Sequence, residues 1–329
     1  MLNLDSTKIL FDSAAIQGHS NQFLSKSICN SFGEIVSESK QLSRIDCSGF
    51  KSISIDSLNG KTSIELSAKI LKENYHFGIN RNTIENVISN INTSGAIQID
   101  SNKFLDSAEI LRCDITDNIK PENNGEMFFK TLSVIPIATK YQTDLYNTPT
   151  NLGVVYNGKQ KSIRERIIFY DKIKDINRDK EIRNSPYAHK LNKDFKGVVR
   201  VESNHSKFKD LRNLFGTRKL YEVLQTDKKV NYEMFSRITK KTTDIDLRLF
   251  NQFEGMRYNE IRKYLGDKGI IEVCGFEWYR VELFLKTFTK HNYRHYKQDL
   301  KKVFNSLKQA TKQTDINIIE HIKQLLYAA

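Results

Sequence analysis

The sequence has no long hydrophobic run. No stretch approaches the roughly 18 to 20 apolar residues that a membrane-spanning helix needs, and residues 1–11, MLNLDSTKILF, lack the basic segment and apolar core of a secretory leader. The four cysteines, Cys29, Cys47, Cys113 and Cys274, stand far apart without a C-x-x-C pair. This spacing argues against a zinc site and suits a reducing cytosol. We therefore expect a cytoplasmic protein with no membrane anchor.

The sequence also lacks the glycine-rich loop that binds ATP phosphates. Its nearest approach, VYNGK at residues 155–159, has too few glycines for that motif. A step that consumes ATP would therefore depend on a partner protein.

Acidic residues are in deficit. Lys and Arg together number 52 against 39 Asp and Glu, which gives a net charge of +13. Residues 157–200 hold thirteen basic and six acidic side chains, and residues 286–312 hold eight basic and one acidic, so each block contributes +7. Such blocks favour a polyanionic partner, above all nucleic acid, because each neutralised phosphate releases counterions. On charge alone, solvated lysine-rich helix faces stay an open alternative.

The pattern of hydrophobic residues changes along the chain. Short segments that alternate between apolar and polar residues recur up to residue 206 and predict half-buried strands, whereas apolar residues at helical intervals follow. We predict an α+β fold, in which an antiparallel sheet packs helices on one face and bears the active site on the other, plus a helical C-terminal domain. The predicted domains are residues 1–206 and 207–329. We expect little regular structure in serine-rich residues 13–50 and a surface excursion over residues 177–194.

Four predicted strands share one peculiarity: each bears ionisable groups on the face opposite its apolar residues. These groups are Glu65 in TSIELS, Arg112 and Asp114 in ILRCDIT, Tyr170 and Lys172 in RIIFYDK, and Arg200 and Glu202 in VVRVES. If the strands are neighbours with these faces aligned, three carboxylates meet beside a tyrosine. Carboxylates in one cleft repel one another unless a divalent cation lies among them, and oxygen ligands suit Mg²⁺ or Mn²⁺. The alternative is a solvated face with ion pairs at its surface.

In their order along the chain, SIELSAK, LRCDITD, RIIFYDKIKD and VVRVES resemble the motifs of rolling-circle replication initiators. The resemblance is to initiators related to the gene II protein of filamentous phages and to those of staphylococcal rolling-circle plasmids, and it covers about residues 5–206. The matching residues are Glu65 with Lys69, Arg112 with Asp114, Tyr170 with Lys172 and Asp175, and Arg200 with Glu202. Asn118 and Asn204 stand where relatives have further acids, and the His-hydrophobic-His motif of commoner rolling-circle nucleases is absent. Metal binding would therefore fall to few carboxylates.

The resemblance implies an origin-specific enzyme that nicks and rejoins DNA in the cytoplasm of a bacterial host. Tyr170 would attack a phosphodiester, which leaves a 5′-phosphotyrosyl bond and a 3′-OH that primes synthesis, and Lys172 would assist it. The resemblance further implies Mg²⁺ or Mn²⁺ as the cofactor, held by Asp114, Glu202 and Glu65.

The same resemblance implies a set of DNA contacts. Arg112 and Arg200 would clamp phosphates or orient the carboxylates, and Lys69 and Arg166 would also contact DNA. Expected partners are origin DNA, both duplex and single-stranded, and a helicase from the host or the element. Residues 207–329 carry none of these motifs, and their basic, tyrosine-bearing stretch 286–312 would recognise the origin or form a homodimer. A mobilisation relaxase and a non-catalytic origin-binding protein are the two alternatives.

Overall fold

The computed structural model describes most of the chain in two compact units. The described residues are 1–20, 22–42, 47–121, 128–129, 132–133, 135, 137–146, 153–160, 165–239, 256–274, 276–288, 293–310 and 318–329. Residues 1–242 and 322–329 form one compact unit, here called the sheet unit, and residues 243–321 form the other, the helical unit.

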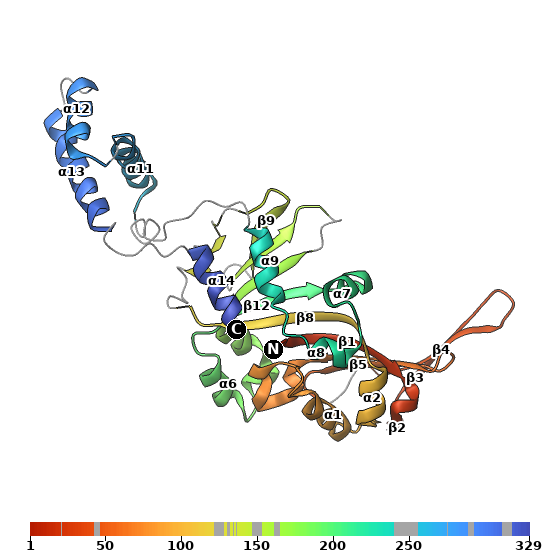
Figure 1. Ribbon diagram of the computed structural model, residues 1–329. Helices are drawn as coiled ribbons and strands as arrows, with labels where there is room; N and C mark the ends of the chain where they lie inside the picture. The colour runs from red at the N-terminus through yellow and green to blue at the C-terminus, as the bar shows by residue number, and fades with distance from the viewer. Residues whose placement is uncertain are drawn as a thin grey trace. The chain divides into compact units, whose positions relative to one another are not determined.

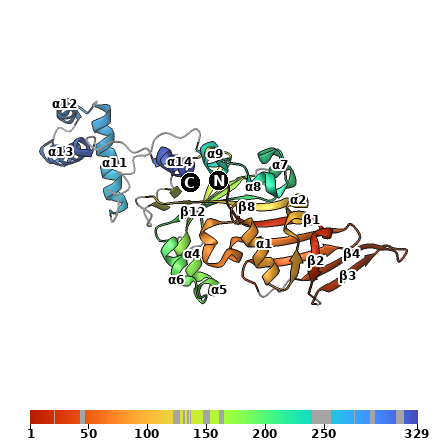
Figure 2. The ribbon, with the colours of Figure 1, turned by 60° about the horizontal axis from the view of Figure 1, so that its bottom comes forward.

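The sheet unit is built on a ten-stranded sheet within the described part of the chain, in which every neighbouring pair is antiparallel. Its order is β3-β4-β5-β6-β1-β8-β12-β11-β10-β9. The strands are β1 (Leu4–Asp12), β3 (Leu24–Cys29), β4 (Ile35–Leu42), β5 (Phe50–Asp56), β6 (Lys61–Ser67), β8 (Glu109–Ile119), β9 (Tyr141–Tyr146), β10 (Gly153–Gly158), β11 (Arg166–Asp171) and β12 (Val199–His205). The β3–β4 hairpin reaches beyond the rest of the sheet (Figures 1 and 2).

Helices and one small sheet complete this unit. The helices are η1 (Ser13–Ala15), η2 (Ala68–Phe77), α1 (Ile84–Thr93), α2 (Ser101–Ser107), α4 (Lys172–Arg178), α5 (Lys180–Arg183), α6 (Ala188–Asp194), α7 (Phe208–Phe215), α8 (Leu220–Leu224) and α9 (Val230–Ile238). Strands β2 (Ile16–His19) and β7 (Ile97–Ile99) pair with each other in a separate two-stranded sheet.

One face of the large sheet is apolar and is covered by helices. Alternate residues of the central strands, among them Ile9, Ile64 and Val201, are fully buried on this face. Helix α1 buries its own stripe of Ile84, Val87, Ile88 and Ile91 in the same core, and α9 contacts β8, β11 and β12. Removing these side chains from water is what drives the helices onto the sheet.

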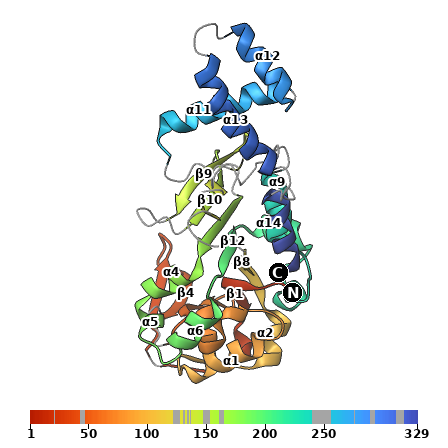
Figure 3. The same ribbon diagram turned by 90° about the vertical axis from the view of Figure 1, so that its left-hand side faces the viewer.

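The opposite, polar face is covered at one end. Helices α4 to α6 lie on the other side of the sheet from α9 (Figure 3), and Phe195, the C-cap of α6, packs edge-on against Tyr75 of η2 at 5.7 Å. The buried arginine of β12, Arg200, lies beneath both rings, with its guanidinium carbon 5.1 Å from the Tyr75 centroid and 5.0 Å from that of Phe195. Ionisable groups at this end are therefore shielded from water.

The helical unit contains α11 (Tyr258–Val273), α12 (Trp278–Phe288) and α13 (Tyr293–Ala310). They pack around a small core of Ile271, Val281, Leu285 and Leu300. Helix α14 (Ile318–Ala328) begins in this unit's range and ends in the sheet unit. Part of the second basic block lies on α13, while residues 289–292 and 311–312 of that block fall outside the described residues. Over the described ranges, no helix combines the length and apolar character needed to cross a membrane.

The predicted fold class is confirmed, with local differences. The units divide at residues 242 and 243 rather than at 206 and 207, because α7, α8 and α9 bury their apolar residues against the sheet. Residues 13–50, expected to be irregular, form β2, β3 and β4, and residues 177–194 contain α5 and α6. Strand β3 was not predicted because all its residues are exposed, so its sequence lacks the alternation of apolar and polar residues that is typical of a half-buried strand.

Candidate active site

The register of the central strands brings the predicted site residues onto the polar face. Tyr170 pairs with Arg200 across β11 and β12, and Asn204 pairs with Asp114 across β12 and β8. Lys8 of β1 lies opposite both Glu65 and Arg112. Directly opposed residues of antiparallel strands project from the same face. The polar face therefore carries Tyr170, Glu202, Asp114 and Glu65, in that order across the sheet.

Tyr170 is a neutral, buried phenol in a charged surrounding. Its side chain is 4% exposed, and its hydroxyl donates a hydrogen bond to Oε1 of Glu202. The Lys172 ammonium donates to the same hydroxyl at 3.2 Å. Burial, followed by the negative charge of Glu202, raises the pKa of Tyr170 well above 10. The hydroxyl is thus protonated at neutral pH, with a proton acceptor and a cation already in contact with it.

Lys172 was predicted to lie in the same strand as Tyr170, but it lies in the helix that follows that strand. Strand β11 ends at Asp171, whose side chain accepts a hydrogen bond from the Lys174 amide and thereby caps α4. Lys172 is the first residue of that helix and is 2% exposed. Its ammonium donates to Asp175 Oδ2 at 2.8 Å and to the Tyr75 hydroxyl at 2.8 Å, besides Tyr170. All three of its protons are therefore used in fixing the ammonium.

Glu202 holds a surplus negative charge. Burial, followed by repulsion from Asp5, raises the pKa of its carboxyl to about 7. The cluster contains two cations, Lys172 and Arg200, but three carboxyl groups, those of Asp5, Asp175 and Glu202. Asp175 and Asp5 each have a cation in direct contact, whereas Glu202 has a phenol. Glu202 is therefore the carboxyl that gains most from protonation.

Arg200 is held inside the cluster. It is 0% exposed, its Nη1 pairs with Asp5, and its Nε donates to Asn118 Oδ1 at 3.0 Å. Burial lowers its pKa, but the attractions of Asp5, Tyr75, Tyr170 and Glu202 together outweigh burial, so the net shift is upward. In this arrangement Arg200 orients a carboxylate, one of the two roles anticipated for it, and presents no surface to DNA.

Two members of the cluster, Asp5 and Tyr75, were not identified from the sequence. Pairing of β1 with β8 shifts register between Leu4 and Ser6, so Asp5 is an extra residue that the bulge turns toward Arg200. Tyr75 comes from the 3₁₀ segment η2, and its hydroxyl accepts from Lys172 and lies 3.4 Å from Arg200 Nη1. Neither a lone acid at a bulge nor a tyrosine in an irregular helix has a spacing that sequence could recognise.

Asp114 and Glu65 have contrasting partners. Asp114 accepts a hydrogen bond from the neutral amide of Asn204, and burial raises its pKa. Glu65 accepts from Arg112 Nη2 at 2.7 Å and lies 3.8 Å from the Lys51 ammonium, so its charge is already neutralised. Over the ranges that the structure describes, no three Asp, Glu, His or Cys side chains gather as metal ligands. Asp114 and Glu202 are the predicted ligands whose negative charge is not matched by a cation in direct contact.

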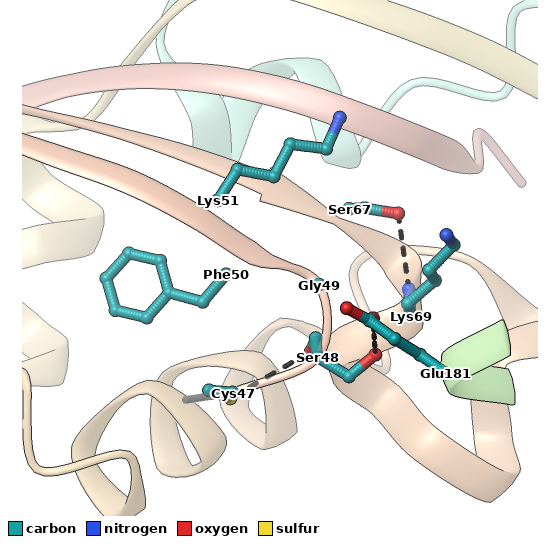
Figure 4. Close-up of a pocket in the computed structure, with 8 residues that line it drawn as sticks. All are labelled: Cys47, Ser48, Gly49, Phe50, Lys51, Ser67, Lys69 and Glu181. Carbon is teal, nitrogen blue, oxygen red and sulfur yellow. Dashed lines mark hydrogen bonds between the residues drawn. The ribbon is translucent and has the colours of Figure 1, made fainter. Parts of the chain in front are cut away.

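Basic residues lie around the cluster on the same face. Lys69 of η2 pairs with Asp179 and is about one-third exposed. Together with Lys51 it lines a pocket of about 450 Å³, whose other lining residues are Cys47, Ser48, Gly49, Phe50, Ser67 and Glu181 (Figure 4). Arg166 is exposed at the start of β11, two and four residues from Ile168 and Tyr170 and thus on their face. Lys51 and Arg166 are therefore exposed, whereas Tyr170 is buried.

Comparison with known proteins gives a weak structural likeness. No protein-family model and no curated protein matches the sequence. Among solved structures, the chain is similar to a rolling circle replication initiator protein from Geobacillus stearothermophilus, with 10% identity and a TM-score of 0.31 over 75% of this chain and 91% of that one. A likeness at this level is too weak to transfer a fold or an activity.

Proposed function

We propose that this chain initiates rolling-circle replication by nicking and rejoining one DNA strand at an origin, through a 5′-phosphotyrosyl bond to Tyr170. The observation that supports this proposal most directly is the Tyr170 hydroxyl, placed between the Glu202 carboxylate and the Lys172 ammonium. A phenol is a weak nucleophile at neutral pH and needs a base and a stabilising charge. Both are present in hydrogen-bonding contact.

The chain's own residues divide the work of the first step. Glu202, with a pKa of about 7, takes the proton as the Tyr170 oxygen attacks phosphorus. Lys172 stabilises the phenolate that develops, and it does so strongly because the site is shielded from water. The bond to the 3′ oxygen breaks, and the released 3′-OH serves as the primer. The phosphotyrosyl bond keeps the energy of the broken ester, so a later 3′-OH restores a phosphodiester without ATP.

Asp114 and Glu202 are the residues that would hold a divalent cation, Mg²⁺ or Mn²⁺. Both carboxyls have raised pKa values, chiefly through burial, and their hydrogen-bonding partners are neutral. A cation there would polarise the phosphate and balance the charge of the transition state. Two carboxylates suffice because Mg²⁺ commonly completes its shell with water and phosphate oxygens. The assignment of Glu65 to this set rests on the sequence alone.

The exposed cations of the polar face are suited to hold the DNA strand. Arg112 and Lys51 are 39% and 48% exposed, and Arg166 is exposed on the same face. These side chains and Lys69 would contact backbone phosphates. Tyr170 is buried, so a local movement has to expose its hydroxyl before a phosphodiester can reach it. We assign origin recognition or dimerisation to the helical unit, and strand separation to a helicase of the host or the element.

Replacing Tyr170 by Phe tests the proposal. Wild-type protein, a supercoiled plasmid bearing the origin, and Mg²⁺ or Mn²⁺ should yield nicked circles with protein bound at the 5′ end. Tyr170→Phe should give neither product, while Tyr221→Phe, which removes an exposed phenol on α8, should behave as wild type. Nicking or covalent attachment by Tyr170→Phe would refute the assignment. A wild-type protein that binds origin DNA without forming an adduct would instead be a non-catalytic binder.

A further inference from the structure

The pocket that Lys51 and Lys69 line is built from three segments that lie far apart in the sequence. They are residues 47–51, which lead into β5, the junction of β6 with η2, and the start of α5 (Figure 4). The volume of the pocket, about 450 Å³, lies within the range of sites that hold small organic ligands. A single nucleotide of a DNA strand is a ligand of this size.

The wall formed by the loop and η2 is rigid. Gly49 has a φ of +83°, and a Cβ at this position would lie 2.2 Å from the backbone nitrogen of Ile70, so glycine alone allows the loop to approach η2 this closely. The Gly49 carbonyl accepts a hydrogen bond from the Ser67 amide at 2.6 Å, and the Ser67 side chain accepts from the Lys69 amide at 3.4 Å. This wall therefore needs little rearrangement to bind a ligand.

The wall formed by α5 is tied to η2 by one aspartate. Asp179 Oδ1 caps α5 by accepting from the amides of Glu181 and Ile182 at 3.0 and 3.2 Å. The second oxygen of Asp179, Oδ2, pairs with the Lys69 ammonium. Glu181 is thus held in place relative to η2, and its carboxylate accepts a hydrogen bond from Ser48 Oγ at 3.2 Å (Figure 4). A carboxylate and a hydroxyl from two different segments therefore meet in the pocket.

Two ammonium groups are available to a phosphate at this pocket. The side chains of Lys51 and Lys69 are 48% and 31% exposed. Lys51 lies 3.8 Å from Glu65 on the polar face, and Lys69 belongs to η2, the segment that also carries Tyr75 into the tyrosine cluster. A DNA strand bound on the polar face would therefore pass the pocket with its phosphates close to both lysines.

The lining residues offer no aromatic platform for a base. Among those that the structure describes, Phe50 carries a ring, but this ring is 3% exposed and points away from Lys69 and Glu181 (Figure 4). Stacking on aromatic rings tolerates every base, because each base has a π-face. A fixed carboxylate and hydroxyl instead discriminate between bases through hydrogen bonds to the base edge.

We propose that this pocket binds one unpaired nucleotide of the origin strand and selects a base that carries an amino group beside a ring-nitrogen acceptor, as cytosine and adenine do. This inference rests on the proposed function. The amino group donates to the Glu181 carboxylate, and the Ser48 hydroxyl turns from Glu181 to donate to the ring nitrogen. Thymine and uracil would place a carbonyl oxygen against the Glu181 carboxylate, where two acceptors repel each other.

The test compares two DNA strands that differ at one base edge. The full chain is titrated with fluorescent oligodeoxyuridines of about twelve residues, a length that suits one single-strand site, with either deoxycytidine or deoxyuridine at the central position. Anisotropy is measured without a divalent cation, so that binding is separated from nicking. The wild type should bind the cytosine probe about tenfold more tightly than the uracil probe.

Variants separate base selection from general effects on binding. Glu181→Gln should reduce the preference to about twofold or less and strengthen binding of the uracil probe, because an amide donates to the uracil oxygen. Ser48→Ala should weaken binding of the cytosine probe alone. Lys51→Met should weaken both probes and keep the preference. Glu85→Gln makes the same charge change at an exposed position of α1 and should match the wild type.

The proposal is overturned if the wild type binds the two probes equally, or if Glu181→Gln and Ser48→Ala keep the preference for cytosine. These results do not depend on the reaction at Tyr170. Covalent adducts formed without a base preference would overturn this inference and leave the proposed function in place. A base preference without any adduct on origin DNA would instead refute the proposed function.

Discussion

Glu202→Gln should stabilise the protein above pH 7 while abolishing nicking. The carboxyl has a folded-state pKa of about 7 against an ordinary value of 4.5, so the folded protein binds the proton more tightly than the unfolded chain does. Stability from this group is therefore complete below about pH 4.5 and declines as the pH rises to about 7. Glutamine has the same shape, accepts the Tyr170 hydrogen bond and carries no charge, so its stability lacks this decline.

The magnitude follows from the pKa difference. At about 1.36 kcal/mol per pKa unit, the difference between 4.5 and about 7 gives an upper bound of about 3 kcal/mol. Glu202 is partly exposed, and solvent screening lowers the expected gain at pH 8 to about 1 to 3 kcal/mol. Urea unfolding of wild type and Glu202→Gln between pH 4.5 and 8.5 measures it directly. If the free energies of unfolding of wild type and Glu202→Gln change in parallel with pH across this range, the raised pKa of Glu202 is wrong.

Four further outcomes follow from the same cluster. Mg²⁺ or Mn²⁺ at about 100 times its dissociation constant should stabilise the wild type by about 2.7 kcal/mol in thermal unfolding, and Asp114→Asn should abolish most of that gain. The rate of nicking at low substrate should rise with pH to a plateau, with a midpoint at or below about 7, because Glu202 acts as a base only when ionised and a bound cation would lower its pKa. Asp5→Asn should move the midpoint of this pH profile to lower pH, because Asp5 raises the pKa of Glu202, and an unchanged midpoint would contradict the repulsion between the two carboxyls. The same variant should lose about 3 to 5 kcal/mol of stability, because it leaves the buried Arg200 without its ion-pair partner. Arg112→Ala should reduce the salt dependence of single-strand binding by about 0.7 in the log–log slope, whereas Arg81→Ala, at an exposed position before α1, should not change it.

Part of this site could be predicted from the sequence because strand geometry is local. Alternation alone placed Glu65, Asp114, Tyr170 and Glu202 on polar faces, and antiparallel pairing of β6, β1, β8, β12 and β11 aligned those faces. A one-residue slip in any of these registers would have turned a strand's polar residues into the core, so burial of the apolar face fixes the alignment.

The rest depends on features without a periodic signal. Asp5 enters the cluster through a bulge, which breaks the period of two at one residue. Lys172 lies next to Tyr170 because Asp171 ends the strand and caps a helix, an alternative that the apolar pattern did not distinguish from a longer strand. Tyr75 is brought in by the packing of η2 against Phe195, a contact between segments about 120 residues apart. Such contacts follow from the assembled fold and not from local spacing.

The distribution of charge in the cluster explains how Tyr170 can stay protonated and buried while a proton acceptor is already in contact with its hydroxyl. Arg200 and Lys172 neutralise Asp5 and Asp175, so the one carboxyl without a cation is the one that touches Tyr170. Near neutral pH that carboxyl is about half ionised, and each approach of positive charge to Glu202 shifts it toward the basic form. The resting site therefore keeps Tyr170 protonated and shielded, and the binding of a cation beside Asp114 would increase the ionised fraction of Glu202 at the time DNA arrives. Asp5 contributes to this state because its repulsion, after burial, raises the pKa of Glu202 and so makes that carboxylate a stronger acceptor for the Tyr170 proton.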